Sequence, residues 1–346
     1  MTTLDRYLLR EASAYLLAGL VVVVLLLLGG VLFEALAPLL SRGVELAAVA
    51  RYLAYRVPEA VYRGLPVAYL FALLLLLSRM AEDSELKALL ASGISRERVM
   101  LPLVAFGGLL SVLGLLLGAE LVPRANQHAR AVLQEAILAR PRALLEPGTF
   151  FTDAYGRLVY VGRVDEAGIG EIRLLSKDEV LLAERGRFEA GELQLEQGLR
   201  ITYDRSRPRT LALFKRARLP LKEIASLPRA PASDLTLSEL KARIEQARAH
   251  DLPHPALATA YYRKFAEPLA SVVFALFAVG VAFWMLGGNR TLGLVGVVTL
   301  TFFYYATWSV FRIMGEQGAI PPWLGAFGPD LFYLALALIF LGVGRR

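Results

Sequence analysis

The stretch YLLAGLVVVVLLLLGGVLF, residues 15–33, carries no charged side chain. A helix needs about 20 mostly apolar residues to cross a hydrocarbon layer about 30 Å thick. The stretch is longer than the apolar part of a cleaved signal peptide, about 7 to 15 residues, and lacks a clear small-residue cleavage site after it. It therefore predicts a membrane anchor that stays in the protein.

Five further apolar runs meet the same length test, in a chain of 346 residues that is 56% hydrophobic. They are Val57–Leu77, Val99–Val122, Phe265–Leu286, Thr291–Met314 and Trp323–Val343. A long polar stretch separates the third run from the fourth. The sequence thus predicts six membrane-spanning helices, arranged three plus three.

Lysine and arginine positions predict the orientation, because cytoplasmic loops are enriched in both. With a cytoplasmic N-terminus, the inner segments contain Arg6, Arg10, Arg79, Lys87, Arg96, Arg98, Arg290, Arg345 and Arg346. The outer segments near the second helix hold Arg42, Arg51 and Arg56, which weakens the bias modestly. We expect both termini in the cytoplasm and the polar region outside.

Short alternating runs between turn residues predict an antiparallel β domain over residues 123–234, a sandwich or jelly roll. The predicted strand regions are 156–164, 170–176, 179–204 and 209–221, with a hairpin turn at Ala190–Glu192. A linker over 235–255 follows, whose helix opens with a capping-box pattern of Thr236 and Glu239. The fold class is therefore a helical membrane protein, with transmembrane segments 1–122 and 256–346 around an inserted, jelly-roll-like all-β domain.

Several kinds of chemistry have no sequence support. The chain has no cysteine, so disulfides and thiolate sites are excluded. GGNRTLG, residues 287–293, lacks the spacing and the lysine of a phosphate-binding loop and predicts a turn instead. His250 and His254 are separated by Pro253 and lack the context of a metal site. We expect no catalytic residue, metal or cofactor, and the net charge of +7 does not by itself indicate nucleic acid.

Charged residues in or beside apolar runs are costly in lipid, so they tend to face a cavity or a partner. Glu59, Arg63, Glu267 and Arg312 fit this description, although side chains at the interface also reach water by extending outward. Gly114 and Gly118 predict a close helix–helix contact.

The connector AEDSELKALLASGISRER, residues 81–98, is built as a capped helix between two apolar runs. Its predicted elements are an N-cap at Asp83 or Ser84, an apolar face of Leu86, Leu89 and Leu90, a C-cap at Gly93 and a helix start at Ser95. On physical grounds alone, this face lies in lipid at the membrane interface or against a protein.

Several stretches together resemble the LptF/LptG family of lipopolysaccharide-export permeases. They are DRYLLREA (5–12), the block from VPEAVYRGL to VMLPLV (57–104), LAERGRFEAGELQLEQGLRITYD (182–204), YYRKFAEPLASVVFALFAVG (261–280) and GEQGAIPPWLGAFGPDLFY (315–333). The similarity spans nearly the whole chain, and the third stretch is similar to the exported β-jellyroll of that family.

The resemblance implies the permease subunit of an ABC-type extractor in the inner membrane, which moves lipopolysaccharide or a related glycolipid toward the outer membrane. The implied partners are an LptB-like ATPase dimer, which hydrolyses the ATP, a second LptF/LptG-type permease, different or identical, and LptC/LptA-like periplasmic bridge proteins. The helix near 83–93 would dock on the ATPase through Glu85, Leu86, Leu89, Leu90 and Ser92.

One departure concerns the lipid phosphates. Some family members carry basic residues near the outer end of the first span, where this chain has Glu34. The expected substitutes for lipid binding are Arg56, Arg63, Arg312 and Phe33. Two other functions stay open: a membrane-anchored scaffold whose β domain binds an outer partner without transport, and a membrane enzyme acting on envelope glycolipids.

Overall fold

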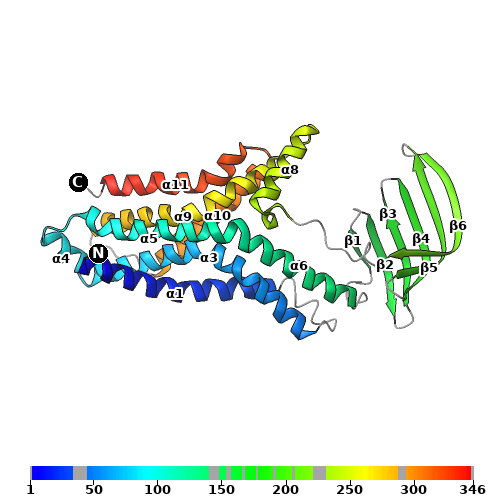
Figure 1. Cartoon of the computed structure of the whole chain (residues 1–346), viewed down its shortest axis with the longest axis horizontal. Helices are drawn as coiled ribbons and strands as arrows, with labels where there is room; N and C mark the ends of the chain where they lie inside the picture. The colour runs from blue at the N-terminus through cyan, green and yellow to red at the C-terminus, as the bar shows by residue number, and fades with distance from the viewer. Residues whose placement is uncertain are drawn as a thin grey trace. The chain divides into compact units, whose positions relative to one another are not determined.

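The computed structural model describes residues 2–33, 45–139, 148–152, 157–165, 168–176, 178–189, 192–204, 207–220, 231–286 and 294–343. The chain divides into two compact units (Figure 1). The first comprises Met1–Gly29, Arg56–Asn126 and Pro231–Arg346, and the second comprises Gly30–Tyr55 and Gln127–Ala230. The domain boundaries expected from the sequence stay predictions.

The helices comprise long apolar helices and shorter helices that connect them. In chain order they are α1 (Thr3–Val31), α3 (Leu46–Glu82), α4 (Glu85–Ala91), α5 (Arg96–Leu116), the π-helix η2 (Leu117–Leu121), α6 (Val122–Ala139), the 3-10 helix η4 (Ala232–Asp234), α8 (Leu237–Ala249), α9 (Pro255–Leu286), α10 (Leu294–Glu316) and α11 (Pro322–Val343). The capping box that begins α8 forms as predicted, since Thr236 Oγ1 accepts from the Glu239 N–H and Glu239 Oε2 accepts from the Thr236 N–H.

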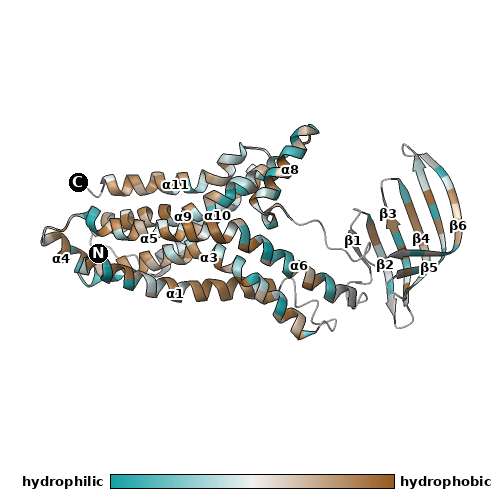
Figure 2. Cartoon of the chain, viewed as in Figure 1, coloured by the Kyte–Doolittle hydropathy of each residue, from teal (hydrophilic) through white to brown (hydrophobic). Residues whose placement is uncertain are grey.

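Five helices within the described residues are long and apolar enough to cross a membrane: Thr3–Val31, Leu46–Glu82, Arg96–Ala136, Pro255–Trp284 and Pro322–Gly342. Figure 2 shows the apolar residues along these helices. Helix α10, with 23 residues, occupies the position of the remaining predicted span. The third span is longer than the sequence predicted, because α5 continues through η2 into α6 without a break.

Burial is very uneven among these helices. In the most apolar 18-residue segment of each helix, the buried share is 78% for α3 and 72% for α9, whereas it is only 6% for α1. Helix α9 packs against α5 and α11, and its Phe274 and Phe277 meet Tyr304 and Tyr333 edge to face. The core is therefore centred on α3 and α9, and most of the apolar surface of α1 is left for lipid or another protein.

Glycines allow the long helices to approach one another closely, as the sequence predicted for Gly114 and Gly118. A Cβ atom added at Gly114 would lie 3.2 Å from Cβ of Pro268, and one at Gly118 would lie 2.6 Å from Cε2 of Tyr62. The predicted close contact is confirmed, and it is made with α9 and α3.

The described strands form one antiparallel sheet of six strands in the order β1-β2-β3-β4-β5-β6. Their bounds are β1 (Thr149–Thr152), β2 (Leu158–Asp165), β3 (Gly168–Leu175), β4 (Glu179–Glu189), β5 (Glu192–Asp204) and β6 (Arg207–Pro220). A membrane domain with an inserted β domain is thus confirmed. The strand order is a meander, in which each strand pairs with its sequence neighbours, whereas a jelly roll has Greek-key connections. Strand β1 was not predicted, and the tip of the predicted hairpin at 190–191 lies outside the described residues.

One face of the sheet is packed with apolar side chains. They include Val159, Val161, Ile169, Ile172, Leu174, Leu181, Ala183, Leu193 and Leu195. The regular pairing is interrupted at Glu171 and Gln197, whose φ angles are 55° and 52°. A groove of about 620 Å³ lies along this interruption, lined by Glu171, Ile172, Arg173, Leu182, Ala183, Glu184, Gln197, Gly198, Leu199, Leu213, Phe214 and Lys215.

Candidate functional site

The connector between α3 and α5 is a short helix with well-defined ends. The C-terminal end of α4 has the pattern of a Schellman motif: Gly93, at φ 85°, donates to the Leu90 carbonyl at 3.1 Å, and Ile94 donates to the Leu89 carbonyl at 3.1 Å. Ser95 caps α5 by accepting from the Arg98 N–H at 3.3 Å. The predicted roles of Gly93 and Ser95 are confirmed. Ser84 occupies the N-cap position of α4, but its side chain makes no capping hydrogen bond.

The apolar face of α4 turns largely toward the chain itself. Leu86 is fully buried in the helical core, and Leu89 and Leu90 are half-buried against the same core. The expectation that Leu86 contacts an ATPase stays a prediction, and in this structure its side chain is enclosed by its own chain. The exposed side of α4 consists of Lys87, Ala88, Ala91 and Ser92.

Glu85 belongs to a polar network with the start of α1. Its Oε2 accepts a 2.8 Å hydrogen bond from the Tyr7 hydroxyl, and Arg79 donates to that hydroxyl at 2.7 Å. Arg79 also pairs with Glu11 at 3.2 Å. Sequence reasoning missed Tyr7 because 78 positions separate it from Glu85, and no local pattern links them.

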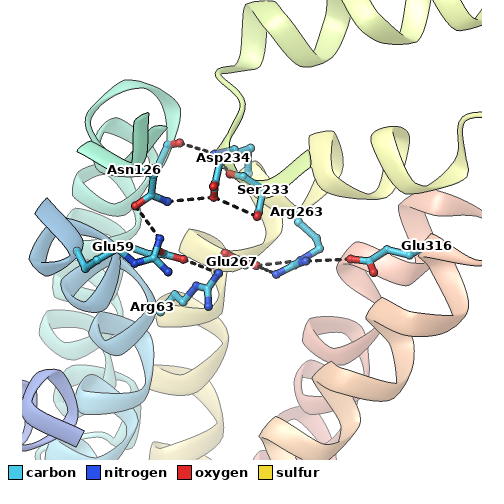
Figure 3. Close-up of polar contacts among 11 residues, drawn as sticks. Glu59, Arg63, Asn126, Ser233, Asp234, Arg263, Glu267 and Glu316 are labelled. Carbon is cyan, nitrogen blue, oxygen red and sulfur yellow. Dashed lines mark hydrogen bonds and ion pairs between the residues drawn. The ribbon is translucent and has the colours of Figure 1, made fainter. Parts of the chain in front are cut away.

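A second polar cluster surrounds Glu59, which lies in α3 toward the N-terminal end from Arg79. The two residues are about 30 Å apart along the helix, since each residue adds 1.5 Å. Glu59 forms ion pairs of 2.6 Å with both Arg56 and Arg63. Figure 3 shows that Arg63 and Glu59 face the α9 residue Glu267. The sequence singled out Glu59, Arg63 and Glu267 separately, and the structure brings them to one place.

The α9 side of this cluster extends to α10. Arg263 pairs with Glu267 and, at 3.4 Å, with Glu316 (Figure 3). Glu316 also pairs with Arg312 at 3.4 Å. The guanidinium groups of Arg263 and Arg312 lie 4.6 and 5.5 Å from the centre of the Trp308 ring. The expected lipid-binding residues Arg56, Arg63 and Arg312 are thus all paired with carboxylates, which reduces their attraction for a phosphate.

The cluster also holds the chain segment that leads into α8. Lys264, which is 6% exposed, donates from Nζ to the carbonyls of Gly118 and Ser233 at 3.0 and 3.1 Å. The Gly118 carbonyl belongs to η2, and in a π-helix regular i→i−4 bonding is interrupted. Sequence reasoning missed Lys264, although a lysine directly beside the apolar run Phe265–Leu286 is a signal by the same rule that flagged Glu267.

The remaining candidates lie elsewhere. Phe33 follows α1 with a 76% exposed side chain, and Glu34 lies outside the described residues. His250 Nδ1 lies 2.8 Å from the Gln246 carbonyl, and Arg248 donates to His254 Nε2 at 3.4 Å. Within the described ranges no three metal-ligating side chains gather.

Apolar spanning helices, a charged cluster buried among them and an inserted antiparallel sheet define a multi-pass membrane protein with an extramembrane β domain. The sequence model of the lipopolysaccharide export system permeases LptF/LptG matches residues 6–342. The chain belongs to this family, so it is an inner-membrane permease of lipopolysaccharide export. No individual curated protein matches it significantly.

Proposed function

We propose that the chain is one half of an ATP-driven extractor, which moves lipopolysaccharide or a related glycolipid from the inner membrane into its β domain. The energy comes from an LptB-like ATPase dimer bound at α4, and a second LptF/LptG-type permease completes the membrane part. LptC/LptA-like proteins then receive the lipid. The observation that carries this proposal is the family match over residues 6–342.

The proposed orientation has both termini and α4 in the cytoplasm and the β domain in the periplasm. Hydrogen bonds from Tyr7 to Glu85 and from Arg98 to Asp5 support a common side for the N-terminus and the connector. The connector also contains Lys87, Arg96 and Arg98, and lysine and arginine in a short loop favour the cytoplasmic side.

The proposed docking surface is the exposed side of α4, namely Lys87, Ala88, Ala91 and Ser92, bordered by Glu85, Leu89 and Leu90. Leu86 supports this surface from below, because it anchors α4 in the core. A helix fixed at both ends transmits a push better than a flexible loop does. This rigidity supports a role in coupling.

The proposed lipid path includes the groove of the sheet. Leu213, on its wall, is 84% exposed and provides apolar surface for an acyl chain. Of the basic candidates, Arg63 retains the most accessible side chain, 45% exposed, against 22% for Arg56 and 32% for Arg312. Arg63 is therefore the strongest candidate for a lipid headgroup contact, and Phe33 offers a further apolar contact.

The test is reconstitution with and without an LptB-like ATPase. We expect the ATPase to co-purify with the chain, and the permease alone to hydrolyse no ATP. Ala88→Arg, on the exposed side of α4, should abolish co-purification, whereas Ala242→Arg, on the exposed side of α8, is the matched control and should not. A stable, lipid-free complex that never contains an ATPase would instead favour the scaffold function.

A further inference from the structure

The start of α1 contacts the connector on both sides of α4. Before α4, Arg79 at the end of α3 reaches Tyr7 and Glu11. After α4, Arg98 in the first turn of α5 pairs with Asp5 at 2.8 Å and donates to Thr2 Oγ1 at 2.7 Å. Between these contacts, Tyr7 reaches α4 itself. The first three turns of α1 are therefore joined to the connector and its flanking helix ends by hydrogen bonds and ion pairs.

The Tyr7 hydroxyl occupies the centre of these contacts. A phenol both donates and accepts a hydrogen bond, so Tyr7 can donate to Glu85 Oε2 while it accepts from the Arg79 guanidinium. Glu11 in turn pairs with Arg79. Hydrogen bonds to ionised groups are stronger than those between neutral groups. The carboxylate of Glu85 is therefore held in place from α1, through a hydroxyl that is itself held by a cation.

The apolar packing of α1 is limited. Its buried residues are Asp5, Leu8, Ala12 and Leu16, all in its first half. Only 6% of its most apolar 18-residue segment is buried. The polar contacts near its start thus contribute a large share of its attachment to the connector.

We propose that Tyr7 and Arg79 are positioning residues for Glu85, and that through them the start of α1 moves together with α4 when the ATPase acts. A displacement of α4 would then be transmitted to the membrane-spanning part of α1, in addition to that of α3 and α5. This inference rests on the proposed function, because it requires an ATPase docked on α4.

The decisive variant is Tyr7→Phe, which removes only the hydroxyl. In the complete complex, reconstituted in vesicles, we expect the amount of lipid extracted per ATP hydrolysed to fall about tenfold, the order expected when a hydrogen bond to a charged group is lost. This ratio does not depend on how much folded complex is present, so a general loss of stability would not change it. Tyr262→Phe on α9 is the matched control and should keep the original ratio.

A second pair of variants tests the cation. Arg79→Gln should lower the same ratio, whereas Arg10→Gln, whose side chain is 80% exposed and lies 3.7 Å from Glu11, should not. Glu85→Gln retains an oxygen that can accept from Tyr7. If Tyr7 acts through Glu85, combining Tyr7→Phe with Glu85→Gln should lower the ratio no further than the more damaging single variant.

The outcomes separate this inference from the proposed function. An intact complex with an unchanged ratio in Tyr7→Phe would overturn the positioning role and leave the proposed function standing. Loss of thermal stability and of assembly in Tyr7→Phe would show that the hydroxyl is only structural, which also overturns it. Failure of the unsubstituted chain to bind any ATPase would overturn both.

Discussion

The side-chain amide of Asn126 donates a 3.1 Å hydrogen bond to Oδ1 of Asp234, which lies 108 positions later in the chain. The same amide accepts a 3.1 Å hydrogen bond from Arg56 through its oxygen. The helical unit is interrupted at Asn126 and resumes at Pro231. One buried side chain therefore joins the segment that leaves this unit to the segment that returns.

Replacing Asn126 by leucine should destabilise the helical unit. The apolar side chain would leave the Asp234 carboxylate without this donor, and a hydrogen bond to a charged group contributes about 1.5–3 kcal/mol. The midpoint of thermal unfolding in detergent measures the effect. Gln127→Leu, at the exposed neighbouring position, is the control, and equal midpoints for the two variants would contradict the role of Asn126.

Glu59→Gln should be far more damaging than Glu120→Gln. Both glutamates pair with an arginine four residues later, but the Glu59 side chain is 8% exposed and the Glu120 side chain is 54% exposed. Breaking a buried pair costs about 3–5 kcal/mol, whereas an exposed pair contributes about 0–1 kcal/mol. Thermal midpoints of the two variants decide the comparison, and similar losses would show that the Glu59 pairs are well solvated.

Gly107→Ala and Gly108→Ala should have opposite effects, although the residues are neighbours in α5. A Cβ at Gly107 would lie 2.8 Å from the Ser271 carbonyl oxygen, so α5 and α9 would have to separate, whereas a Cβ at Gly108 meets nothing within 4 Å. Overpacking costs about 1–3 kcal/mol, while alanine in an unstrained helix position stabilises by about 0.4–1 kcal/mol. Unfolding midpoints that move in the same direction would contradict this packing.

The capping box of α8 predicts a dependence on pH. Hydrogen bonds from the Thr236 backbone N–H and hydroxyl lower the pKa of Glu239 below its ordinary value of 4.5. Because the folded pKa is the lower one, the stabilisation is present above pH 4.5 and is lost as the pH falls through the folded pKa. The advantage of the unsubstituted chain over Glu239→Gln in unfolding midpoint should therefore shrink in acid.

Glu245→Gln, on the exposed side of the same helix, is the control for this titration. A difference between the unsubstituted chain and Glu239→Gln that stays constant from neutral to acidic pH would show that the ionised cap does not contribute.

Local patterns predicted much of the architecture. Apolar runs of sufficient length indicated the membrane helices, and the residues with special backbone or capping roles, Gly93, Ser95 and Thr236, were found because their signals lie within a few positions. Alternation indicated the strands, but it cannot order them within a sheet, and this is why a meander was not distinguished from a jelly roll.

The sites were harder to predict because they depend on partners distant in sequence. Helical spacing showed that Leu86 lies on an apolar face, but not that its own chain covers that face. Similarly, Arg56, Arg63 and Arg312 stood out as basic residues near the membrane, while their carboxylate partners became evident only when α3, α9 and α10 were placed together.

The π-helix η2 contains about one residue more per turn than an α-helix, because its hydrogen bonds join residues i and i+5. Removing a single residue there would allow regular α-helical bonding and would leave α6 close to its present orientation, so Asn126 would still face Asp234. The Gly118 carbonyl would instead take part in regular helical hydrogen bonding, which would compete with the hydrogen bond from Lys264. The extra residue in this five-residue segment therefore makes a backbone carbonyl available to Lys264 without changing the direction of α6.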